Sequence, residues 1–377
     1  MQTKYRILPI ILVVYLLLIK ASFATGFRAD PVLTGLAFPV SMAFSKDGRL
    51  FFTERCTGNI RVIEGVSSSR PEIKPDAVYQ FGPVSCYFER GLLGLALDPQ
   101  FDKNGFLYVY YSHKGSGPND LYRHRLMRIT VKDNTGSNSS AILDNLPIGS
   151  QRDGGRGNHN GGNIAFGPDG KLYVTIGDLA EPENSTDMQS FAGKILRLNP
   201  DGSAPRDNPF YEPSKPASPK SYIYAYGFRN SFDFTFHPVV GIMYATENGP
   251  ESNDELNMIN RGKNYGWDKD EVSGKRNMTY FEDPLLVYTP TIAPTGITFY
   301  RGTRYPAEYR SNLYFADWNN GHIHRVTFKE REEKKILQVD DNFYVHQEGI
   351  VDIIEGPDGY LYFSDPKGIY RIVYEKD

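Results

Sequence analysis

The sequence predicts an all-β protein, a six-bladed β-propeller, and three observations support this fold class. A unit with an alternating apolar strand, a short polar turn that usually holds glycine, and a second strand of aliphatic and aromatic residues occurs six times. A further strand follows most of these units. Because no helical periodicity separates them, small sheets packed around a central axis explain the pattern far better than an α/β sandwich.

Each unit has the pattern of a β-hairpin, with an Asp-Gly or Asn-Gly turn that bends at low steric cost. The units are, in chain order, Met42–Glu54, Leu95–Tyr111, Ile164–Asp178, Phe234–Glu247, Ile297 continued by Asn312–Asp317, and Ile353–Asp365. The strands that follow are expected at Gly58–Glu64, Arg123–Val131, Gly193–Asn199, Gly321–Thr327 and Gly368–Tyr374. We expect Pro31–Pro39 to supply the strand that closes the last blade, because ring closure hides the sheet edges.

The chain is expected to form one propeller domain, residues 25–377, behind a secretory signal, residues 1–24. Two basic residues precede the 13-residue apolar run Ile7–Ile19, and small residues end at Ser22-x-Ala24. The run is short for a transmembrane helix, and an uncleaved N-terminal anchor is the alternative. Either interpretation places the propeller in an extracytoplasmic space, as a secreted, cell-surface or periplasmic protein.

Composition and cysteine content agree with an exported β-protein. Hydrophobic residues make up 40% of the chain and aromatic residues 14%, which is ample for stacked sheets. The net charge of −3 gives no electrostatic reason to expect a nucleic-acid partner. The two cysteines, Cys56 and Cys86, are interpreted as a disulfide between neighbouring loops, with two unrelated buried thiols as the alternative.

Four segments together resemble the soluble glucose and aldose sugar dehydrogenases, also called the glucose/sorbosone dehydrogenase family. They are ERGLLGLALDPQF (Glu89–Phe101), GNHNGGNIAFGPDGKLYVTIGD (Gly157–Asp178), YGFRN (Tyr226–Asn230) and ENGPESNDELNMINRGKNYGW (Glu247–Trp267). The similarity extends from about Gly35 to Val373. It implies a six-bladed propeller that holds pyrroloquinoline quinone and calcium in a central pocket, oxidises the C1 hydroxyl of a sugar substrate, and passes electrons to an external acceptor.

His159 is the candidate catalytic base. It is followed by Asn160-Gly161-Gly162, and glycine-rich loops let a side chain approach a flat ligand closely. The resemblance places the catalytic base at this position, and a neutral imidazole suits removal of a sugar hydroxyl proton. A quinone would accept the hydride, since no side chain does so. The other six histidines are interpreted as structural: His113, His124, His237, His322, His324 and His346.

The resemblance also assigns cofactor and calcium ligands. Arg229 and Asn230 match the pair that contacts the cofactor, and Glu89 occupies a position near substrate or cofactor. Carbonyl and carboxylate oxygens are the ligands that calcium prefers. By resemblance, the carbonyls of Gly249 and Pro250 would bind calcium beside the quinone, and Glu255 and Tyr265 would belong to a second calcium site. The alternative is that this acidic turn is only a solvated loop.

The sequence departs from the family pattern where cations are expected around an anionic cofactor. Asn319 and Asn320 stand near the position of a lysine, and Gly349 and Val351 replace two arginines that hold the quinone carboxylates. Such a loss should weaken cofactor binding, since an unpaired buried carboxylate is costly. Asn158 also replaces an acidic residue that would orient the imidazole. The candidates for compensating cations are Arg55, Arg90, Arg152 and Arg156.

Three functions follow, in this order. The first is an exported, calcium-containing quinoprotein that oxidises aldoses. The second is a propeller that binds a sugar or a protein without redox chemistry, because propellers often serve as binding platforms. The third is a calcium-dependent sugar lactonase that uses carboxylates drawn from Glu89, Asp178, Glu247 and Asp317.

Overall fold

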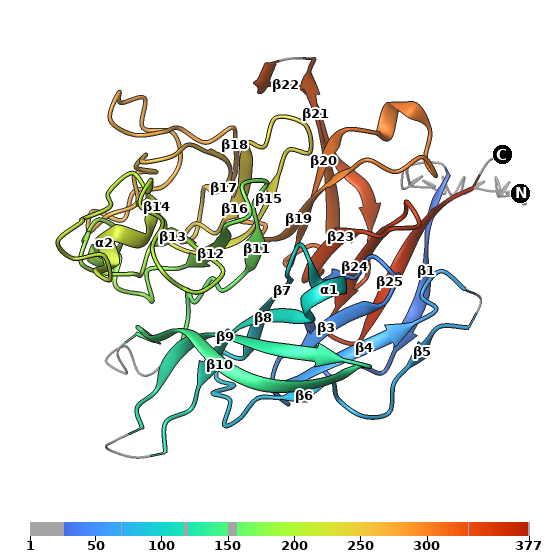
Figure 1. Cartoon of the computed structure of the whole chain (residues 1–377). Helices are drawn as coiled ribbons and strands as arrows, with labels where there is room; N and C mark the ends of the chain where they lie inside the picture. Colours follow the sequence, from blue (N-terminus) through green and yellow to red (C-terminus); the bar gives the residue numbers. More distant parts are fainter. Residues whose placement is uncertain (1–25, 69, 117–119, 150–156, 331, 376–377) are drawn as a thin grey trace, which may run out of the picture.

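The structure, a computed structural model, describes residues 26–68, 70–116, 120–149, 157–330 and 332–375. The expected signal segment, residues 1–24, and the candidate cations Arg152 and Arg156 lie outside the described residues. Six antiparallel sheets form a ring of blades, which confirms the six-bladed β-propeller (Figure 1). No helix in the described part of the chain is long and apolar enough to cross a membrane.

The blades follow one another along the chain. Blade 1 contains β2 (Pro39–Phe44), β3 (Leu50–Glu54), β4 (Asn59–Glu64), β5 (Glu72–Ile73) and β6 (Tyr79–Gln80), and blade 2 contains β7 (Leu92–Leu97), β8 (Phe106–His113), β9 (Arg123–Lys132) and β10 (Thr135–Leu146). Blade 3 contains β11 (Ile164–Phe166), β12 (Leu172–Ile176), β13 (Lys194–Leu198) and β14 (Ile223–Tyr226), and blade 4 contains β15 (Ser231–Phe236), β16 (Met243–Glu247), β17 (Asp254–Ile259) and β18 (Leu286–Tyr288).

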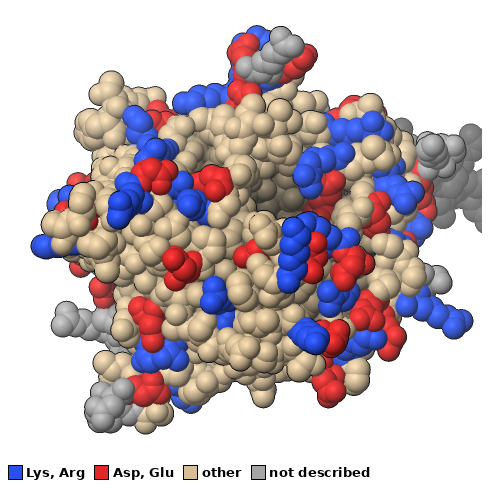
Figure 2. Space-filling view, viewed as in Figure 1, with Lys and Arg blue, Asp and Glu red and all other residues tan. Residues whose placement is uncertain are grey.

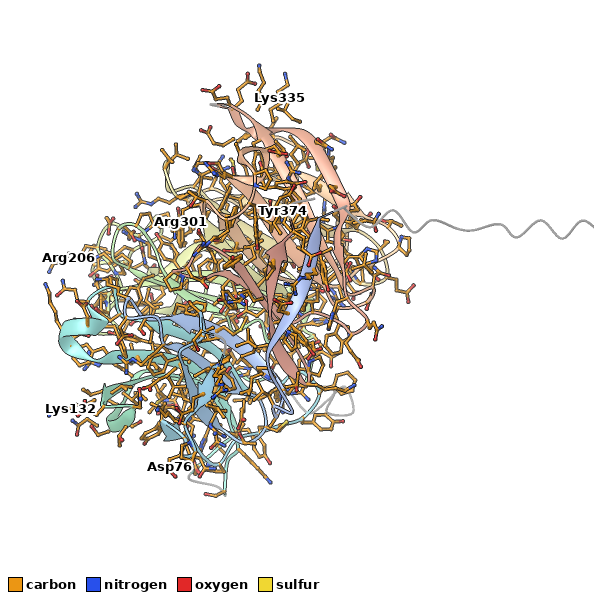
Figure 3. The ribbon with its side chains drawn as sticks, turned by 90° about the vertical axis from the view of Figure 1, so that its right-hand side faces the viewer. Asp76, Lys132, Arg206, Arg301, Lys335 and Tyr374 are labelled. Carbon is orange, nitrogen blue, oxygen red and sulfur yellow. A yellow bond between two sulfur atoms is a disulfide. The ribbon has the colours of Figure 1, made fainter. Side chains whose placement is uncertain are left out.

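The last two blades have the same order of strands. Blade 5 contains β19 (Pro294–Tyr300), β20 (Asn312–Asp317), β21 (His322–Lys329) and β22 (Glu332–Val345), and blade 6 contains β23 (Asp352–Glu355), β24 (Leu361–Asp365), β25 (Gly368–Tyr374) and β1 (Phe27–Thr34). Short helical segments lie in the connections: α1 (Phe101–Asn104), η2 (Pro182–Ser185), α2 (Pro219–Tyr222) and η3 (Ala307–Tyr309). The β21–β22 hairpin projects from the ring, with Lys335 near its tip (Figures 1 and 3).

The hairpin turns have the chemistry that the sequence predicts. Gly48, Gly170 and Gly359, each preceded by aspartate, adopt φ angles of 87°, 71° and 79°, which are unfavourable for residues with a side chain. The Asp169 carboxylate also accepts a hydrogen bond of 3.1 Å from the backbone N–H of Lys171. These local turns set the spacing of the first two strands in each blade.

The first strand of every blade lies nearest the axis. Contacts join β2 to β7, β7 to β11, β11 to β15, β15 to β19, β19 to β23, and β23 back to β2. This closed series of contacts shows that the six first strands surround the centre of the ring. Residues on these strands, and on the loops that precede them, therefore face a common central space.

The ring is closed by β1, which pairs with β25 from Phe27 opposite Tyr374 to Thr34 opposite Gly368. Figure 3 shows Tyr374 beside the blue strand β1. The expected closing strand, Pro31–Pro39, therefore lies too late in the sequence, because Pro39 already begins β2 of the first blade. The physical reason is that Phe27 packs among aromatic rings of blades 5 and 6, 4.9 Å from Tyr309 and 5.0 Å from Tyr374 between ring centroids.

Hydrophobic clusters lie between adjacent blades. Six clusters of buried residues occur in the described part of the chain, one for each interface between neighbouring blades. Tyr108 and Tyr110 of blade 2, for example, pack with Val174 and Leu196 of blade 3, and all four are almost fully buried. Burying one large apolar side chain stabilises the folded state by about 1.5–3 kcal/mol, so these interfaces hold the ring rigid around its centre.

Candidate active site

A cavity of about 400 Å³ lies at the centre of the ring. The face seen in Figure 2 is hollowed near its middle. Half of the apolar residues that line the cavity are aromatic, and its polar lining contains more carboxyl groups than cations. The lining residues are Phe38, Val40, Ser41, Arg55, Phe88, Glu89, Leu93, Gly161, Asn163, Asn230, Phe232, Asp233, Asn248, Ala293, Thr295, Trp318, Val351 and Asp352.

His159 lies beside this cavity on a tightly folded loop. Its own φ is 55°, in the left-handed region, and the loop packs so closely on Gly177 that a Cβ there would lie 2.1 Å from the His159 carbonyl oxygen. The His159 backbone N–H donates to Glu89 Oε2 at 2.7 Å, and Glu89 lines the cavity. The glycine-rich segment thus holds the histidine next to the central space, as the sequence predicts.

The imidazole of His159 is oriented by Asp178, which is fully buried. The distance from His159 Nδ1 to Asp178 Oδ1 is 2.6 Å. Trp267 Nε1–H donates to Asp178 Oδ2 at 2.7 Å, and the backbone N–H of Ala180 donates to Oδ1 at 2.8 Å. Because two other donors hold this carboxyl as an acceptor, we assign the proton to His159 Nδ1, which leaves Nε2 with a free lone pair.

This arrangement corrects one inference from the sequence. Asn158 lacks the charge to orient the histidine. Asp178 takes that role: it follows β12, the second strand of the hairpin whose first strand comes after His159. A carboxyl group that holds the second ring nitrogen fixes the tautomer and the orientation of the ring. The substitution at Asn158 therefore does not remove the orienting group from the base.

Carboxyl groups recur at this end of the blades. Glu54, Glu247, Asp317 and Asp365 end the second strands of four blades, and Asp178 follows the second strand of blade 3 by two residues. All are buried, and three of the aspartates pair with histidine: Asp178 with His159, Asp317 with His324 and Asp365 with His346. Of these histidines, His159 donates its own backbone N–H to a residue of the cavity lining, Glu89.

Arg229 and Asn230, which are expected to contact the cofactor together, lie in different places in the structure. Asn230 lines the cavity, where its Oδ1 accepts from the Gly161 N–H at 3.1 Å and its Nδ2 donates to Glu89 at 3.4 Å. Arg229 lies outside the cavity lining, donates to the Asn248 carbonyl at 3.0 Å, and has its guanidinium carbon 5.6 Å from the centre of the Trp267 ring. Arg229 thus supports the walls around the site.

Of the two candidate cations that the structure describes, Arg55 lines the cavity. Arg90 is buried behind it and donates to the Ile148 carbonyl at 2.7 Å. Asn319, expected in the cofactor site, is exposed and donates to the Thr291 carbonyl at 2.9 Å. Val351 lines the cavity as an apolar residue, so among the described residues Arg55 is the one cation in the lining.

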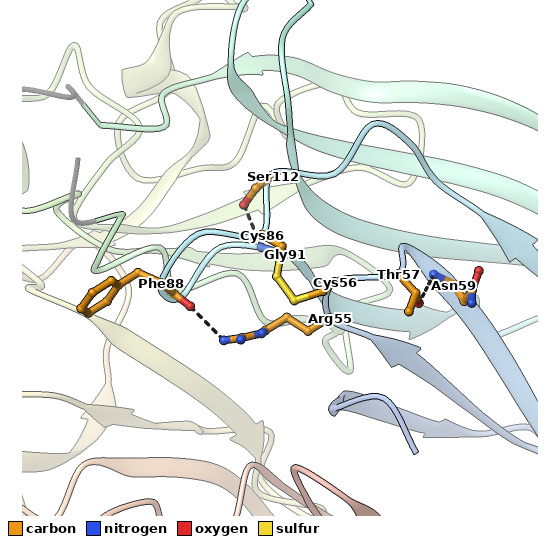
Figure 4. The surroundings of a disulfide bond; sticks show 8 residues. All are labelled: Arg55, Cys56, Thr57, Asn59, Cys86, Phe88, Gly91 and Ser112. Atoms are coloured by element: carbon orange, nitrogen blue, oxygen red, sulfur yellow. Dashed lines mark hydrogen bonds between the residues drawn. A yellow bond between two sulfur atoms is a disulfide. The ribbon is translucent and has the colours of Figure 1, made fainter. Parts of the chain in front are cut away.

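Cys56 and Cys86 form the expected disulfide (Figure 4), with 5.1 Å between their Cα atoms. It joins the loop after β3 to the loop before β7 and so links blades 1 and 2. The neighbour of Cys56, Arg55, donates from Nη1 to the Phe88 carbonyl at 2.9 Å. The disulfide therefore ties together the two loops that place Arg55 and Glu89 at the cavity.

Within the segment expected to bind calcium, the two acidic residues lie in a buried strand, whereas Gly249 and Pro250 lie in the loop between β16 and β17, where Pro250 is exposed. Asp254 and Glu255 begin β17, and every residue of β17 is buried. Glu255 Oε1 accepts from the Gly274 N–H at 2.6 Å, and the Tyr265 hydroxyl donates to the Met258 carbonyl at 2.7 Å. Asp254 Oδ1 accepts from the Gly249 N–H at 2.7 Å. Much of the predicted ligand set is thus already hydrogen-bonded within the protein.

A small second cavity of about 10 Å³ adjoins this strand, lined by Glu247, Gly249, Glu255 and Tyr265 among others. Glu247 lies opposite Glu255 in the β16–β17 ladder, and its Oε2 is buried without a hydrogen-bond partner. Burial and the facing Glu255 raise the pKa of Glu247 well above its usual range. No group of three or more histidine, cysteine or acidic side chains in metal-binding arrangement occurs among the described residues.

Comparison with known proteins agrees with the fold and the motifs. The family described as Glucose / Sorbosone dehydrogenase matches residues 36–371. The chain belongs to the glucose/sorbosone dehydrogenase family. Quinoprotein glucose dehydrogenase B of Acinetobacter calcoaceticus is 32% identical over 272 residues, which cover 64% of this chain and 52% of that protein.

Solved structures of family members have the same architecture. The PQQ-bound aldose sugar dehydrogenase of Streptomyces coelicolor has a TM-score of 0.76 and 25% identity, covering 93% of this chain and 98% of that one. A Thermus thermophilus protein described as a candidate oxidoreductase (glucose dehydrogenase) has a TM-score of 0.79 and 30% identity, covering 92% of this chain and 100% of that one. The chain therefore belongs to a family of PQQ-type sugar dehydrogenases.

Proposed function

We propose that this chain is an aldose sugar dehydrogenase that oxidises the C1 hydroxyl of a sugar, with His159 as the general base. One observation carries the proposal: Asp178, itself held by Trp267, hydrogen-bonds the imidazole beside the central cavity, and no described residue engages Nε2. A base needs an open nitrogen within reach of substrate and a fixed tautomer. The hydrogen bond to Asp178 supports a fixed tautomer, and the bond from the His159 N–H to the lining residue Glu89 supports a position near the substrate.

Oxidation of a cyclic aldose to its lactone removes one proton from the hydroxyl group and one hydride from C1. Nε2 of His159 would take the proton, and Asp178 would stabilise the imidazolium through the Nδ1–H hydrogen bond. Glu89 Oε1, on the cavity wall, is available to accept a sugar hydroxyl while Oε2 holds the His159 loop. The hydride needs a two-electron acceptor, which is the role of the quinone in this family.

The residues that line the cavity do not fit the tricarboxylate quinone, because they lack the several cations that would hold its carboxylates. The described lining offers one guanidinium, from Arg55, whereas Glu89, Asp233 and Asp352 bring three carboxyl groups. Burial raises the pKa of Asp352 to about 7, and burial together with Asp352 raises the pKa of Asp233. A carboxylate bound beside them would raise these pKa values further, and burying it without a cation is unfavourable. The geometry therefore supports the reaction as far as proton removal, and PQQ binding is treated separately below.

Calcium is the second part of the proposal. The carbonyls of Gly249 and Pro250 would bind one ion, and Glu255 with Tyr265 a second. The unpartnered Oε2 of Glu247 in the small cavity supports a cation near Glu255, because a buried carboxylate without a partner is costly. Calcium-dependent thermal stability that Glu255→Gln removes would support this site. An unchanged melting temperature with calcium or chelator would count against it.

Export through the N-terminal segment is also proposed. The Cys56–Cys86 disulfide supports it, because disulfides persist in oxidising compartments. N-terminal sequencing of protein recovered outside the cytoplasm tests this, and a start after residue 24 is expected. Recovery of full-length chain in the membrane fraction would instead favour the uncleaved anchor.

The activity test uses mature protein supplied with calcium and PQQ, with dye reduction followed across several aldoses. We expect sugar-dependent reduction that His159→Gln lowers by about 10²- to 10⁴-fold. His237→Gln is the matched control, since His237 lies in the β15–β16 turn and accepts from the backbone N–H of Val239. Equal losses in both variants would show that His159 is not the base.

A propeller that binds a sugar or protein without redox chemistry is the second candidate, because the expected cationic clamp is missing from the described cavity. Sugar binding by calorimetry without turnover on any quinone would favour it. The lactonase has less support. Asp317 pairs with His324 at 3.0 Å, Glu247 is held by the Arg229 and Asn230 backbone, and these carboxylates do not gather into a metal site among the described residues.

A further inference from the structure

The side of the cavity where the family places cations is an aromatic wall in this chain. The rings of Trp318 and Phe38 stack with centroids 6.0 Å apart and 27° between their planes. The guanidinium carbon of Arg55 lies 4.3 Å from the centre of the Phe38 ring. All three side chains line the central cavity. Together these three side chains, the Trp318–Phe38–Arg55 wall, give this part of the lining an aromatic character with one guanidinium beside it.

Trp318 leaves no room for a cationic side chain at Gly349, which is one of the three positions where the family pattern has a cation. A Cβ at Gly349 would lie 2.5 Å from the Trp318 carbonyl oxygen and 2.8 Å from carbons of its indole ring. Any side chain at Gly349 would therefore require Trp318 to move. Val351 contributes an apolar surface and Asn319 points its amide to the Thr291 carbonyl. Packing against Trp318 thus accounts for the absence of a cationic side chain at Gly349.

The remaining charge favours a ligand with few anionic groups. Only Nη1 of Arg55 has a hydrogen-bond acceptor among the described residues, and its buried Nε has none. Arg55 can accordingly serve one carboxylate. A second or third carboxylate would find no further cation among the described lining residues, and an unpaired ionic group in a confined site is costly.

We infer that the central cavity takes a planar quinone with at most one carboxylate, stacked on the Trp318–Phe38–Arg55 wall, in place of the tricarboxylate quinone. This inference rests on the proposed dehydrogenase function and names the class of its acceptor. Such a quinone would accept the C1 hydride and one proton, passed on from His159, to become the hydroquinone, while the sugar leaves as the lactone. Arg55 is then the specificity-determining residue for the acceptor.

The test compares PQQ with its trimethyl ester, which has the same ring system without the three charges. Quenching of tryptophan fluorescence gives both dissociation constants in calcium-containing buffer without any need for turnover. We expect the wild-type protein to bind the ester at least about tenfold more tightly than PQQ. Equal binding, tighter binding of PQQ, or no binding of either compound would overturn the inference.

Restoring the cations should reverse the preference. Asn319→Lys with Val351→Arg is expected to tighten PQQ binding by about tenfold or more and to leave ester binding within about threefold. Val239→Lys with Val240→Arg adds the same charges to an exposed turn and should change neither constant. Asn319→Lys alone, at an exposed position, keeps the test available if Val351→Arg misfolds. Unchanged PQQ binding in the folded clamp variants would refute the charge argument.

The binding and activity tests fail separately. Preferential ester binding without sugar oxidation would leave the cavity inference standing and remove the proposed dehydrogenase. Sugar oxidation with PQQ by a wild-type protein that binds PQQ and the ester equally tightly would support the proposed dehydrogenase and remove the cavity inference.

Discussion

Replacing Asp178 by asparagine exchanges one carboxylate oxygen for an NH2 group within the hydrogen bonds that orient His159. Asp178 accepts from three donors: His159 Nδ1 at 2.6 Å, Trp267 Nε1 at 2.7 Å and the Ala180 N–H at 2.8 Å. An amide has one oxygen, so its NH2 group must face at least one of these donors. If it faces His159, Nδ1 must become the acceptor and the ring proton moves to Nε2, which removes the base.

The magnitude follows from the same contacts. Loss of one or two buried hydrogen bonds should lower the free energy of unfolding by about 1–3 kcal/mol. Loss of the correct tautomer behind a histidine base should lower kcat by about 10²- to 10⁴-fold. Urea unfolding measures the first quantity and steady-state dye reduction with saturating aldose measures the second.

A matched variant separates the two effects. Asp169→Asn makes the same exchange in the β11–β12 turn of the same blade, where Asp169 accepts from Tyr173 and Arg197. We expect it to reduce stability and to leave kcat within about twofold. Asp178→Asn with the wild-type kcat and an unchanged near-ultraviolet circular dichroism spectrum would refute the role given to Asp178.

Three further outcomes are expected. Burial raises the pKa of Asp352 to about 7, so the stability linked to its protonated form is present below about pH 4 and lost as pH rises through about 7. The free energy of unfolding of Asp352→Asn, relative to wild type, should therefore increase between about pH 4 and about pH 8 by on the order of 3 kcal/mol. The same difference between variant and wild type at both pH values, measured by urea unfolding, would contradict this. Replacing Cys56 and Cys86 by alanine should lower the free energy of unfolding by about 3–4 kcal/mol, given a sequence separation of 30, and a loss below about 1 kcal/mol would contradict the stabilising role. Chelation of calcium should lower the melting temperature of wild type more than that of Glu255→Gln, which keeps the proposed Gly249–Pro250 site, and equal shifts by calorimetry would exclude Glu255 as a ligand.

Most of the fold could be predicted because its signals are local. Each hairpin has its turn and both strands within one short stretch, and glycines such as Gly48 and Gly359 mark the turns directly. The position of the closing strand could not be predicted correctly because β1 pairs with β25 at the far end of the chain. No local pattern distinguishes Phe27 as its start, since that is decided by packing on Tyr309 and Tyr374.

The site could be predicted only in part. The glycine-rich loop indicates His159, but the sequence presents its orienting partner, Asp178, only as one of several pocket carboxylates, because hydrogen-bond pairing is not visible there. The resemblance leads us to expect Arg229 and Asn230 to act together. Both residues lie in the irregular segment between β14 and β15, where no strand periodicity assigns their side chains to one side or the other.

The cavity wall shows what side-chain packing adds. The missing cations at Gly349 and Val351 are visible in the sequence, but the wall that replaces them is not. Trp318 lies over Gly349 and stacks on Phe38, a residue from the other end of the chain. The charge of the cavity, and hence the class of acceptor, depends on this long-range contact.

The most direct measurement of the central claim is lactone formation by the mature protein supplied with calcium, an aldose and either PQQ or its trimethyl ester. We expect oxidation that requires both sugar and quinone and that falls by about 10²- to 10⁴-fold in a folded His159→Gln variant. A wild-type protein that oxidises no aldose with either quinone, or a His159→Gln variant with the wild-type rate, would contradict the assignment of this chain as a sugar dehydrogenase with His159 as its base.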